Sequence, residues 1–287
     1  MGRDKQTNLI NLLPAFDNTR DTRFFFESSQ HAEALGRLAY IAKDRSMGMG
    51  MLTGEIGSGK TITRTVLANR LDPTEFKIVT LENSLLGFDD ILLEIISQIR
   101  GERVQALNFP DRYSRISEYK RLIIGTVANM GRHLLIIVDE AQQLSSSALD
   151  ELKGLSNICS ERENYSTIIL IGQPELRSRV KSLPQVDQRI SLRFHLNAIA
   201  SEEVENYLVH RMKIAGCQGR VPFTRQAAQR ISRASEGIPR NINRISKLAL
   251  TYCESQGLSR VSEDVVSLVV EDLNDHSANR NPVYLFG

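Results

Sequence analysis

Hydrophobic residues follow two patterns along this chain, and the change comes near residue 200. Before that point, short apolar runs alternate with amphipathic stretches. The runs have the length and polar boundaries of strands buried on both faces of a parallel sheet, which predicts strands at residues 47–52, 76–81, 134–138, 167–171 and 192–196. The amphipathic stretches predict helices at residues 61–70, 89–100, 117–130 and 147–159. Strands and helices that alternate in this way are typical of a doubly wound α/β domain.

The two ends of the chain are patterned differently. Residues 1–23 lack apolar periodicity and contain Pro14, which predicts a flexible arm or a segment docked on a partner. Beyond residue 200, capping residues such as Thr224 and terminating glycines such as Gly237 indicate helices alone. We therefore predict four parts: a flexible arm at residues 1–23, an α/β domain at 24–199, a small all-helical domain at 200–273 and a loose tail at 274–287.

Composition narrows the class of protein only slightly. The 287 residues are 41% apolar and 24% charged, with a net charge of +2, as in an ordinary globular protein. No apolar run approaches the ~18 residues needed to cross a bilayer, and the N-terminus is polar rather than signal-like. We therefore expect a cytoplasmic protein without membrane insertion. The cysteines, Cys159, Cys217 and Cys253, are odd in number and widely spaced, which predicts buried free thiols.

The most specific chemical signal follows the first predicted strand. Residues 54–61 fit the phosphate-loop pattern G-x-x-x-x-G-K-[ST]. In this pattern backbone N–H groups close on the β-phosphate, Lys60 reaches the outer phosphates and Thr61 gives its hydroxyl to Mg²⁺. The sequence thus predicts a site for ATP and Mg²⁺ formed by Gly54, Glu55, Ile56, Gly57, Ser58, Gly59, Lys60 and Thr61, with Thr63 in the helix that follows.

A second signal lies at the end of the third predicted strand, where Asp139 and Glu140 directly follow the apolar residues 134–138. The carboxyl ends of parallel strands face the ligand crevice. Asp139 is therefore placed to hold Mg²⁺, and Glu140 to orient and deprotonate an attacking water. Taken alone, such a pair is equally well explained as a solvated strand end. After a phosphate loop it predicts an ATPase.

Six segments together resemble the ExeA-type AAA+ ATPases, over residues 24 to about 273. They are Phe25-Phe26-Glu27-Ser28 with His31, residues 52–61, Val138-Asp139-Glu140-Ala141-Gln142, Gly172-Gln173-Pro174-Glu175-Leu176, Gln188-Arg189-Ile190 and Gly237-Ile238-Pro239-Arg240. The resemblance implies an AAA+ P-loop NTPase fold, with a parallel five-stranded sheet flanked by helices and then a small helical lid. It also implies ATP with Mg²⁺ at the subunit boundaries of a homo-oligomer, either a ring or a helical filament.

The resemblance assigns roles to three side chains near the phosphates. Gln173 would be sensor 1, which contacts the γ-phosphate or the lytic water; the alternative is a turn glutamine before a proline. Arg189 would be the arginine finger that reaches the ATP of the adjacent subunit, with Arg193 as its competitor. Arg240 would be sensor 2, which moves onto the β- and γ-phosphates when the lid closes. The candidate catalytic residues are therefore Glu140, Lys60, Arg189, Gln173 and Arg240.

Two further placements stay open. His31 and the aromatic residues 24–26 can flank the adenine or can pack in a core. Asn83, after the second strand, can restrain Glu140 until a partner binds or can be a polar strand end.

The family has two branches, which imply different functions. One helps to assemble secretin channels of type II secretion and usually carries a membrane segment and a wall-binding domain after the ATPase. The other comprises transposition helpers similar to the TniB, TnsC and phage Mu B proteins, which coat duplex DNA when ATP is bound and recruit a transposase. Because this sequence stops after the lid, we expect the second branch.

Two groups of basic residues favour contact with DNA. Residues 220–250 hold seven basic residues against one acid, a local charge of +6. A second group begins at Arg100, the last residue of the predicted helix at residues 89–100. Either group can neutralise DNA phosphates without reading the base sequence. The alternative is that these basic residues are merely solvated or pair with acids of a neighbouring subunit. We favour the second group, which consists of Arg100, Arg103, Arg112, Arg115, Lys120 and Arg121.

The leading hypothesis is an ATPase that oligomerises on duplex DNA as a transposition regulator and target selector. Its partners would be a transposase and, as a further candidate, a targeting protein. The alternative is a cytoplasmic ExeA-type ATPase that assists assembly of a type II secretion (secretin) complex. A third hypothesis is a nucleotide-gated scaffold that barely hydrolyses ATP. In the first two cases hydrolysis is expected to be slow and stimulated by oligomerisation.

Overall fold

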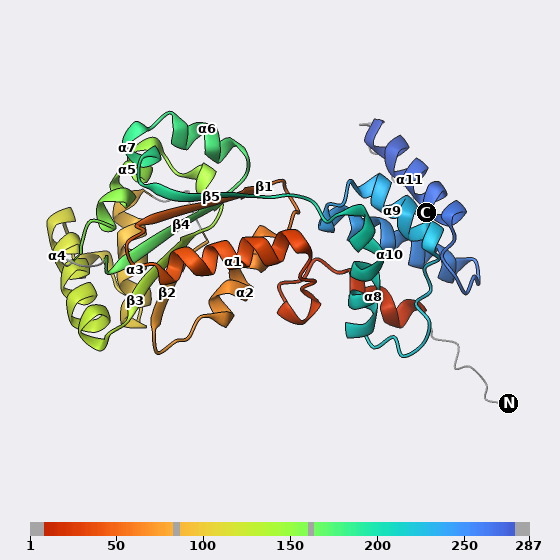
Figure 1. The fold of residues 1–287 in the computed structure, drawn as a ribbon, viewed down its shortest axis with the longest axis horizontal. Coiled ribbons are helices and arrows are strands. Elements are labelled where there is room, and N and C mark those ends of the chain that lie inside the picture. The colour runs from red at the N-terminus through yellow and green to blue at the C-terminus, as the bar shows by residue number, and fades with distance from the viewer. Residues whose placement is uncertain (1–8, 83–86, 160–163, 279–287) are drawn as a thin grey trace. The chain divides into compact units, whose positions relative to one another are not determined.

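The structure, a computed structural model, describes residues 9–82, 87–159 and 164–278. Two compact units make up the chain (Figure 1). Residues 31–56 and 60–197 form an α/β unit. A helical unit contains the described residues up to Gln30, the short segment Gly57–Gly59, and the described chain from Ala198 onward.

The α/β unit is built on one sheet of five parallel strands. They are β1 (Met49–Gly54), β2 (Phe76–Leu81), β3 (His133–Val138), β4 (Ser166–Gly172) and β5 (Ile190–Leu196), in the order β2-β3-β4-β1-β5. Each strand begins within two residues of its predicted position, and the predicted parallel five-stranded sheet is confirmed. Every residue of β3 and β4 is buried, which explains why both are continuous apolar runs in the sequence.

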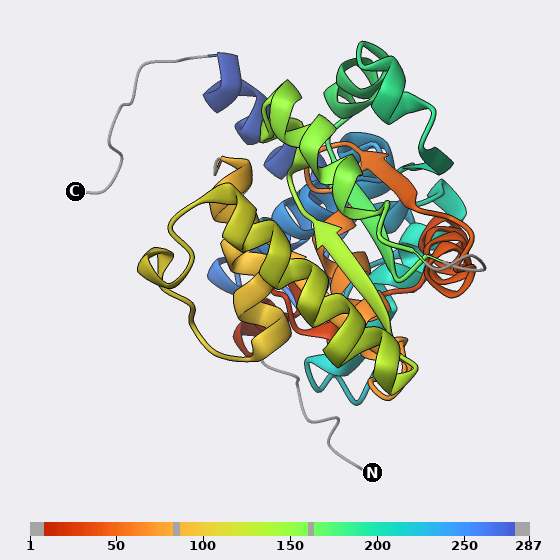
Figure 2. The ribbon, with the colours of Figure 1, turned by 90° about the vertical axis from the view of Figure 1, so that its left-hand side faces the viewer.

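Helices cover both faces of this sheet. They are α1 (Ser29–Lys43), α2 (Lys60–Arg70), α3 (Phe88–Arg100), α4 (Arg112–Leu122), α5 (Ser146–Leu155), α6 (Glu175–Lys181) and α7 (Pro184–Asp187). Alternate residues of β1 to β4 form one hydrophobic core with α3, α4 and α5, and Figure 2 shows α3 and α4 side by side. The sequence pattern does not predict α6 and α7, because helices of seven and four residues are too short to show a period.

The predicted helix at residues 117–130 differs in its start and in its regularity. Its α-helical part, α4, begins at Arg112, where the Asp111 side chain accepts a hydrogen bond from the Ser114 N–H at 2.7 Å. The chain then continues as a π-helical turn (Ile123–Val127) and a 3₁₀ turn (Ala128–Met130). The cap lies before the apolar period begins, so the periodicity alone places the start too late.

The helical unit is built from α8 (Val204–Ile214), α9 (Arg225–Ser235), α10 (Pro239–Ser255) and α11 (Glu263–Ala278), with 3₁₀ helices at Leu9–Phe16, Thr22–Phe24 and Ser201–Glu203. Thr224 caps α9 as predicted, accepting a hydrogen bond from the Ala227 N–H at 3.1 Å. Gly237 and Pro239 separate α9 from α10. These helices enclose a second hydrophobic core.

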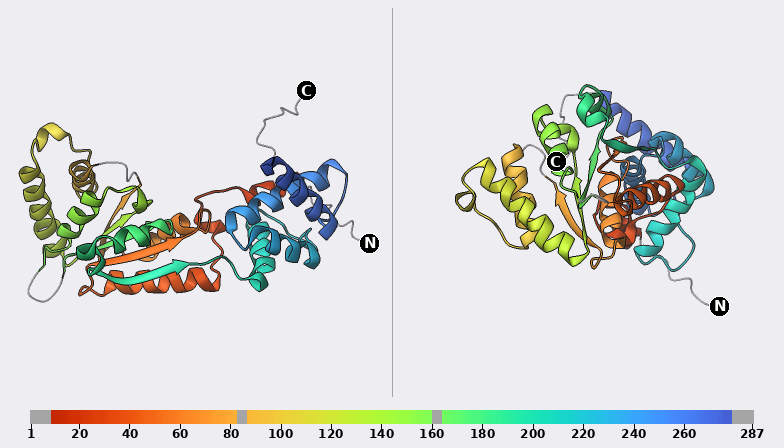
Figure 3. Two further views of the ribbon diagram at one scale, coloured as in Figure 1. Left: turned by 90° about the horizontal axis from the view of Figure 1, so that it is seen from above. Right: turned by 60° about the vertical axis from the view of Figure 1, so that its left-hand side comes forward.

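The described part of the N-terminal segment is folded, contrary to the expected flexible arm. Leu9, Leu12, Ala15 and Phe16 are buried in the core of the helical unit. The 3₁₀ helix that carries them, drawn in red in Figure 3, contacts α8 and α10. Arg211 of α8 also donates hydrogen bonds to backbone carbonyls of this segment. The apolar residues recur every three positions, the period of a 3₁₀ helix, so a search for periods of 3.6 or 2 does not detect them. Residues 1–8 lie outside the described residues.

Three smaller expectations can be compared with the structure. Residues 274–278 continue α11 and do not form a loose tail, while residues 279–287 lie outside the described residues. All three cysteines are free thiols, as predicted, but Cys159 is exposed while Cys217 and Cys253 are buried. Within the described residues, no helix combines the length and apolar character that crossing a membrane requires.

Candidate nucleotide-binding site

The loop between β1 and α2 has the strand–loop–helix setting that a phosphate loop requires. β1 ends at Gly54 and α2 begins at Lys60. Gly57 and Gly59 have φ angles of 83° and 99°, in the left-handed region that side chains with a Cβ rarely adopt. Glycines in this conformation allow successive backbone N–H groups of a loop to form an anion-binding concavity. Ser58 and Thr63 are buried.

The last residue of the phosphate-loop pattern, Thr61, meets the first residue of the acidic pair, Asp139, in the α/β unit. The Thr61 hydroxyl donates a hydrogen bond to Asp139 Oδ2 at 3.1 Å. Lys60 is 6% exposed, and its ammonium donates to the carbonyl oxygens of Gly54 and Glu55 at 2.8 Å each. Hydroxyl and carboxylate oxygens are the hard ligands that Mg²⁺ prefers, so the pair Thr61 and Asp139 fits this ion. Residues 78 positions apart in sequence are thus brought together as predicted.

Arg64 is a part of this site that the sequence analysis does not identify. It is 4% exposed, and its guanidinium lies 3.6 Å from Asp139 Oδ2 and 2.9 Å from Glu82 Oε1. This cation lies between two acids and fixes the orientation of the Asp139 carboxylate. The sequence contains one signal for this role of Arg64. Arg64 follows Thr61 by three positions, and residues three apart on a helix lie on the same face.

Glu140 has an unusual backbone conformation, and two glutamines contact its carboxylate. It has a φ angle of 50°, which is strained for a residue with a side chain. Gln142 Nε2 donates to Glu140 Oε2 at 2.6 Å, and Gln173 Nε2 lies 3.4 Å from the same oxygen. Gln142 Oε1 in turn accepts from the Gln173 backbone N–H at 3.1 Å. We call this connection, from the Glu140 carboxylate through the Gln142 amide to Gln173, the glutamine bridge.

Gly172 leaves the space that the glutamine bridge needs. A Cβ at this position would lie 2.6 Å from Gln142 Oε1, closer than carbon and oxygen can approach. The Arg179 guanidinium also donates to the backbone carbonyls of Gln142 and Leu144. The bridge is therefore fixed by its surroundings as well as by its own hydrogen bonds.

His195 is a second polar residue near the loop that the sequence analysis does not identify. It lies at the carboxyl end of β5, and its Nδ1 is 3.0 Å from the hydroxyl of Thr53, the residue before Gly54. Burial, followed by the positive charge of Arg177, lowers the pKa of His195 below its ordinary value. The imidazole is therefore neutral at pH 7.

Arg189 lies at the opposite end of the sheet from the phosphate loop. It directly precedes β5, and Ile190 is paired with Met49 at the start of β1. The length of β1 therefore separates Arg189 from Gly54, roughly 16 Å at the rise of a strand. Arg189 is exposed, and within the described part of the chain no acid pairs with it. Arg193, in contrast, donates to the Asp187 carboxylate at 2.8 Å and to its carbonyl oxygen at 2.7 Å.

The remaining candidates for nucleotide contact lie in different surroundings. Phe24 is half-buried, and the Arg211 guanidinium lies 5.1 Å from the centre of its ring. Phe26 packs against Tyr207 at the core of the helical unit. Contact of these aromatics with the adenine stays a prediction. His31 is buried near the start of α1. Arg240 is the second residue of α10, and its backbone N–H donates to the Gly57 carbonyl within the helical unit at 3.3 Å. Asn83 lies outside the described residues.

Half of the basic residues proposed for DNA contact are paired with acids inside the α/β unit. Arg100 and Arg121 both bind Glu118, at 2.5 and 2.7 Å, and this lowers the pKa of the Glu118 carboxyl to about 2. Arg112 binds Asp89 and Glu151 at 3.0 and 2.6 Å. Arg115 donates to the Phe109 carbonyl, while Arg103 and Lys120 are exposed. DNA contact by these residues stays a prediction.

The fold and the site together define a class of protein. A five-stranded parallel sheet in this order, with the phosphate loop after β1, the acidic pair after β3 and a helical unit after β5, is the AAA+ P-loop NTPase fold. Residues 43–180 match the family described as AAA domain.

Two proteins of known name are similar to this chain in sequence. The chain is 32% identical over 263 residues to the general secretion pathway protein A of Aeromonas hydrophila, which is ExeA; the match covers 91% of this chain and 47% of that protein. The chain thus spans about half the length of that relative. It is also 23% identical to replication factor C subunit 2 of Arabidopsis thaliana, over 83% of this chain and 61% of the relative.

Solved structures share the fold. The ORC2 protein of Aeropyrum pernix matches with a TM-score of 0.66 at 21% identity, covering 90% of this chain and 70% of that one. The RuvB branch migration motor of Thermotoga maritima matches with a TM-score of 0.53 at 16% identity, covering 84% and 69%. At these identities the comparison supports the fold alone.

Proposed function

We propose that this protein binds and hydrolyses Mg²⁺-ATP in a homo-oligomer. The observation that carries the proposal is the hydrogen bond between Thr61 and Asp139, with Glu140 next to it, because it joins the phosphate loop to the acidic pair. The loop residues would hold the triphosphate, and Lys60 would leave the loop carbonyls to bind the outer phosphates.

The side chains around Glu140 suggest how hydrolysis is arranged. Thr61 and Asp139 would hold Mg²⁺, which neutralises charge on the phosphates when bound. Glu140 would accept a proton from the attacking water, and Gln173, adjacent to it, would orient that water. Arg240, at the start of α10, would contact the phosphates as sensor 2.

The finger position favours hydrolysis between subunits. Arg189 is exposed at the sheet end away from its own phosphate loop, whereas Arg193 is bound to Asp187. We therefore propose that Arg189 completes the site of an adjacent subunit, where a guanidinium stabilises charge that develops in the transition state.

For the biological role we propose the secretion alternative: an ATPase that assists assembly of a type II secretion complex, with a secretin-side protein as partner. The support is the identity with general secretion pathway protein A across nearly the whole chain. The comparisons give no support to the transposition role, which the sequence analysis places first.

Two variants and one partner assay test this proposal. Lys60→Ala should abolish ATP binding, measured by fluorescence of a labelled nucleotide, while Glu140→Gln should bind ATP and fail to release phosphate. Equal ATP affinity in wild type and Lys60→Ala would contradict the site. The purified chain should bind secretion components and leave a duplex DNA fragment unretarded; ATP-dependent, salt-sensitive retardation would favour the transposition role instead.

A further inference from the structure

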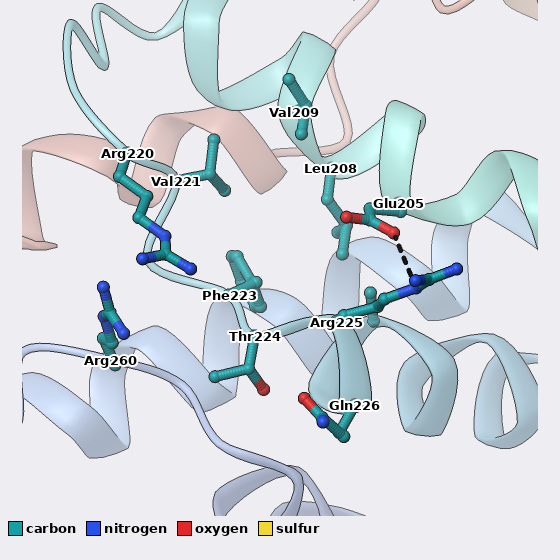
Figure 4. A pocket seen from close by; sticks show the side chains of 11 residues that line it. Glu205, Leu208, Val209, Arg220, Val221, Phe223, Thr224, Arg225, Gln226 and Arg260 are labelled. Atoms are coloured by element: carbon teal, nitrogen blue, oxygen red, sulfur yellow. Dashed lines mark ion pairs between the residues drawn. The ribbon is translucent and has the colours of Figure 1, made fainter.

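A pocket of about 520 Å³ lies in the helical unit, and the ATPase mechanism does not use it (Figure 4). Its walls come from α8, the start of α9, the segment between them and Arg260 in the segment between α10 and α11. Its volume is in the range of sites that hold small ligands or a few side chains. None of its lining residues belongs to the phosphate loop or the acidic pair.

The rim of this pocket is basic. Arg220, Arg225 and Arg260 line it, against a single acid, Glu205. Arg225 lies 3.9 Å from Glu205, with both side chains more than half exposed, so this ion pair is weak. Arg220 and Arg260 point toward one another in Figure 4. Within the described residues, no acid pairs with either of them, which leaves two like charges facing each other.

Backbone pairing holds these two arginines in place. Phe223 and Val261 form a parallel bridge between the segments that carry Arg220 and Arg260. The Val261 N–H donates to the Pro222 carbonyl at 2.9 Å, and the Thr224 N–H donates to the Val261 carbonyl at 3.0 Å. The two segments therefore stay side by side without a ligand, and their arginines are presented together.

The floor of the pocket is apolar. Leu208 of α8, Val221 and Phe223 line it, and Phe223 is fixed by an edge-on contact with Phe16 at 5.7 Å between ring centres. A phosphodiester backbone has no group that gains from such a floor. A peptide gains from both parts, since an apolar side chain can cover the floor while carboxylates bind the arginines in a two-pronged geometry.

We propose that this pocket docks an acidic peptide segment of a partner protein. One apolar side chain of the peptide would lie on Leu208, Val221 and Phe223, and its carboxylates would bind Arg220 and Arg260. The match is one of charge and shape, because a rim with three arginines and one acid surrounds an apolar floor. This docking is separate from ATP hydrolysis and does not depend on it.

A random peptide library displayed on phage and selected on the immobilised full chain tests the proposal. The selected sequences should combine Asp or Glu with a Leu, Ile, Met or Phe, and the same selection on the double variant Arg220→Ala/Arg260→Ala should lose them. Arg233→Ala is the matched control, because Arg233 is exposed on α9 and does not line the pocket. Melting temperature and ATPase rate should be alike in all three proteins.

Binding of a selected, fluorescently labelled peptide then gives the size of the effect. The double variant should bind about tenfold more weakly than wild type, and Arg233→Ala within about twofold. Selection of sequences without acids, or equal binding by the double variant, would overturn the proposal. So would displacement of the peptide by a 30-base-pair duplex whose own binding requires Arg220 and Arg260, since the pocket would then be a nucleic-acid site.

Discussion

Removing the glutamine bridge should raise the basal ATPase rate. In the structure Glu140 Oε2, one of the two oxygens of the proposed base, accepts hydrogen bonds from Gln142 and Gln173. A carboxylate oxygen that accepts a short hydrogen bond is less free to turn toward water. The substitution Gln142→Ala deletes the shorter of these bonds and leaves the phosphate loop untouched.

The size of the effect follows from the geometry of the bond. A 2.6 Å hydrogen bond to a half-buried carboxylate contributes about 1.5–3 kcal/mol. Gln173 remains near the same oxygen, so the lower end of this range applies. If the bridge must open before water is activated, Gln142→Ala should raise basal kcat roughly tenfold. The KM for ATP should change little.

Phosphate release measured over a range of protein concentrations provides the assay. The rate of Gln142→Ala should be higher than that of wild type at low concentration, and the two should converge as oligomers form. Gln143→Ala is the matched control, because Gln143 is exposed and adjacent in sequence. A fall in kcat for Gln142→Ala, with unchanged melting temperature, would show that the bridge positions Glu140 for catalysis and refute restraint.

Three other predictions rest on separate observations. Gly172→Ala should reproduce the Gln142→Ala rate, because its Cβ would lie 2.6 Å from Gln142 Oε1; a wild-type rate would contradict the packing. Arg189→Ala should bind ATP without hydrolysing it, and mixing with Glu140→Gln subunits should restore turnover, whereas Arg193→Ala should stay active; absence of rescue would place the finger elsewhere. Burial lowers the pKa of His133 from 6.5 to about 4. Between pH 6.5 and 4 only the unfolded chain binds this proton, so acid favours unfolding in this range. The free energy of unfolding should therefore fall by about 3 kcal/mol as the pH falls from 6.5 to 4. In urea unfolding, stability should therefore depend less on pH in His133→Gln than in wild type, and equal pH profiles would refute the assignment.

The sequence predicts those parts of the fold that depend on burial alone. The strands β3 and β4 are buried on both faces, so each residue contributes to the same apolar signal. The meeting of Thr61 with Asp139 is likewise predictable, because parallel strands place their carboxyl ends at one edge. The segment Leu9–Phe16 escapes prediction because a 3₁₀ helix repeats every three residues and because its burial depends on helices far along the chain.

Side-chain networks are the part of the site that the sequence does not determine. Gln142 follows Glu140 by two positions, and their side chains meet across a turn in which Glu140 has a left-handed backbone. The pairing of Arg100 and Arg121 with Glu118 is similar: the sequence gives a local excess of basic residues, whereas folding places an acid between two of them. Charge counted along a sequence therefore overstates the charge available to a ligand.

The folded N-terminal segment has a consequence for protein synthesis. Leu9, Leu12 and Phe16 are translated before α8 and α10, the helices that cover them, because the α/β unit lies between in the sequence. Until α8 and α10 emerge, this apolar stretch lacks the helices that bury it. A shortened chain that begins at α1 would leave a cavity in the helical unit where these side chains pack.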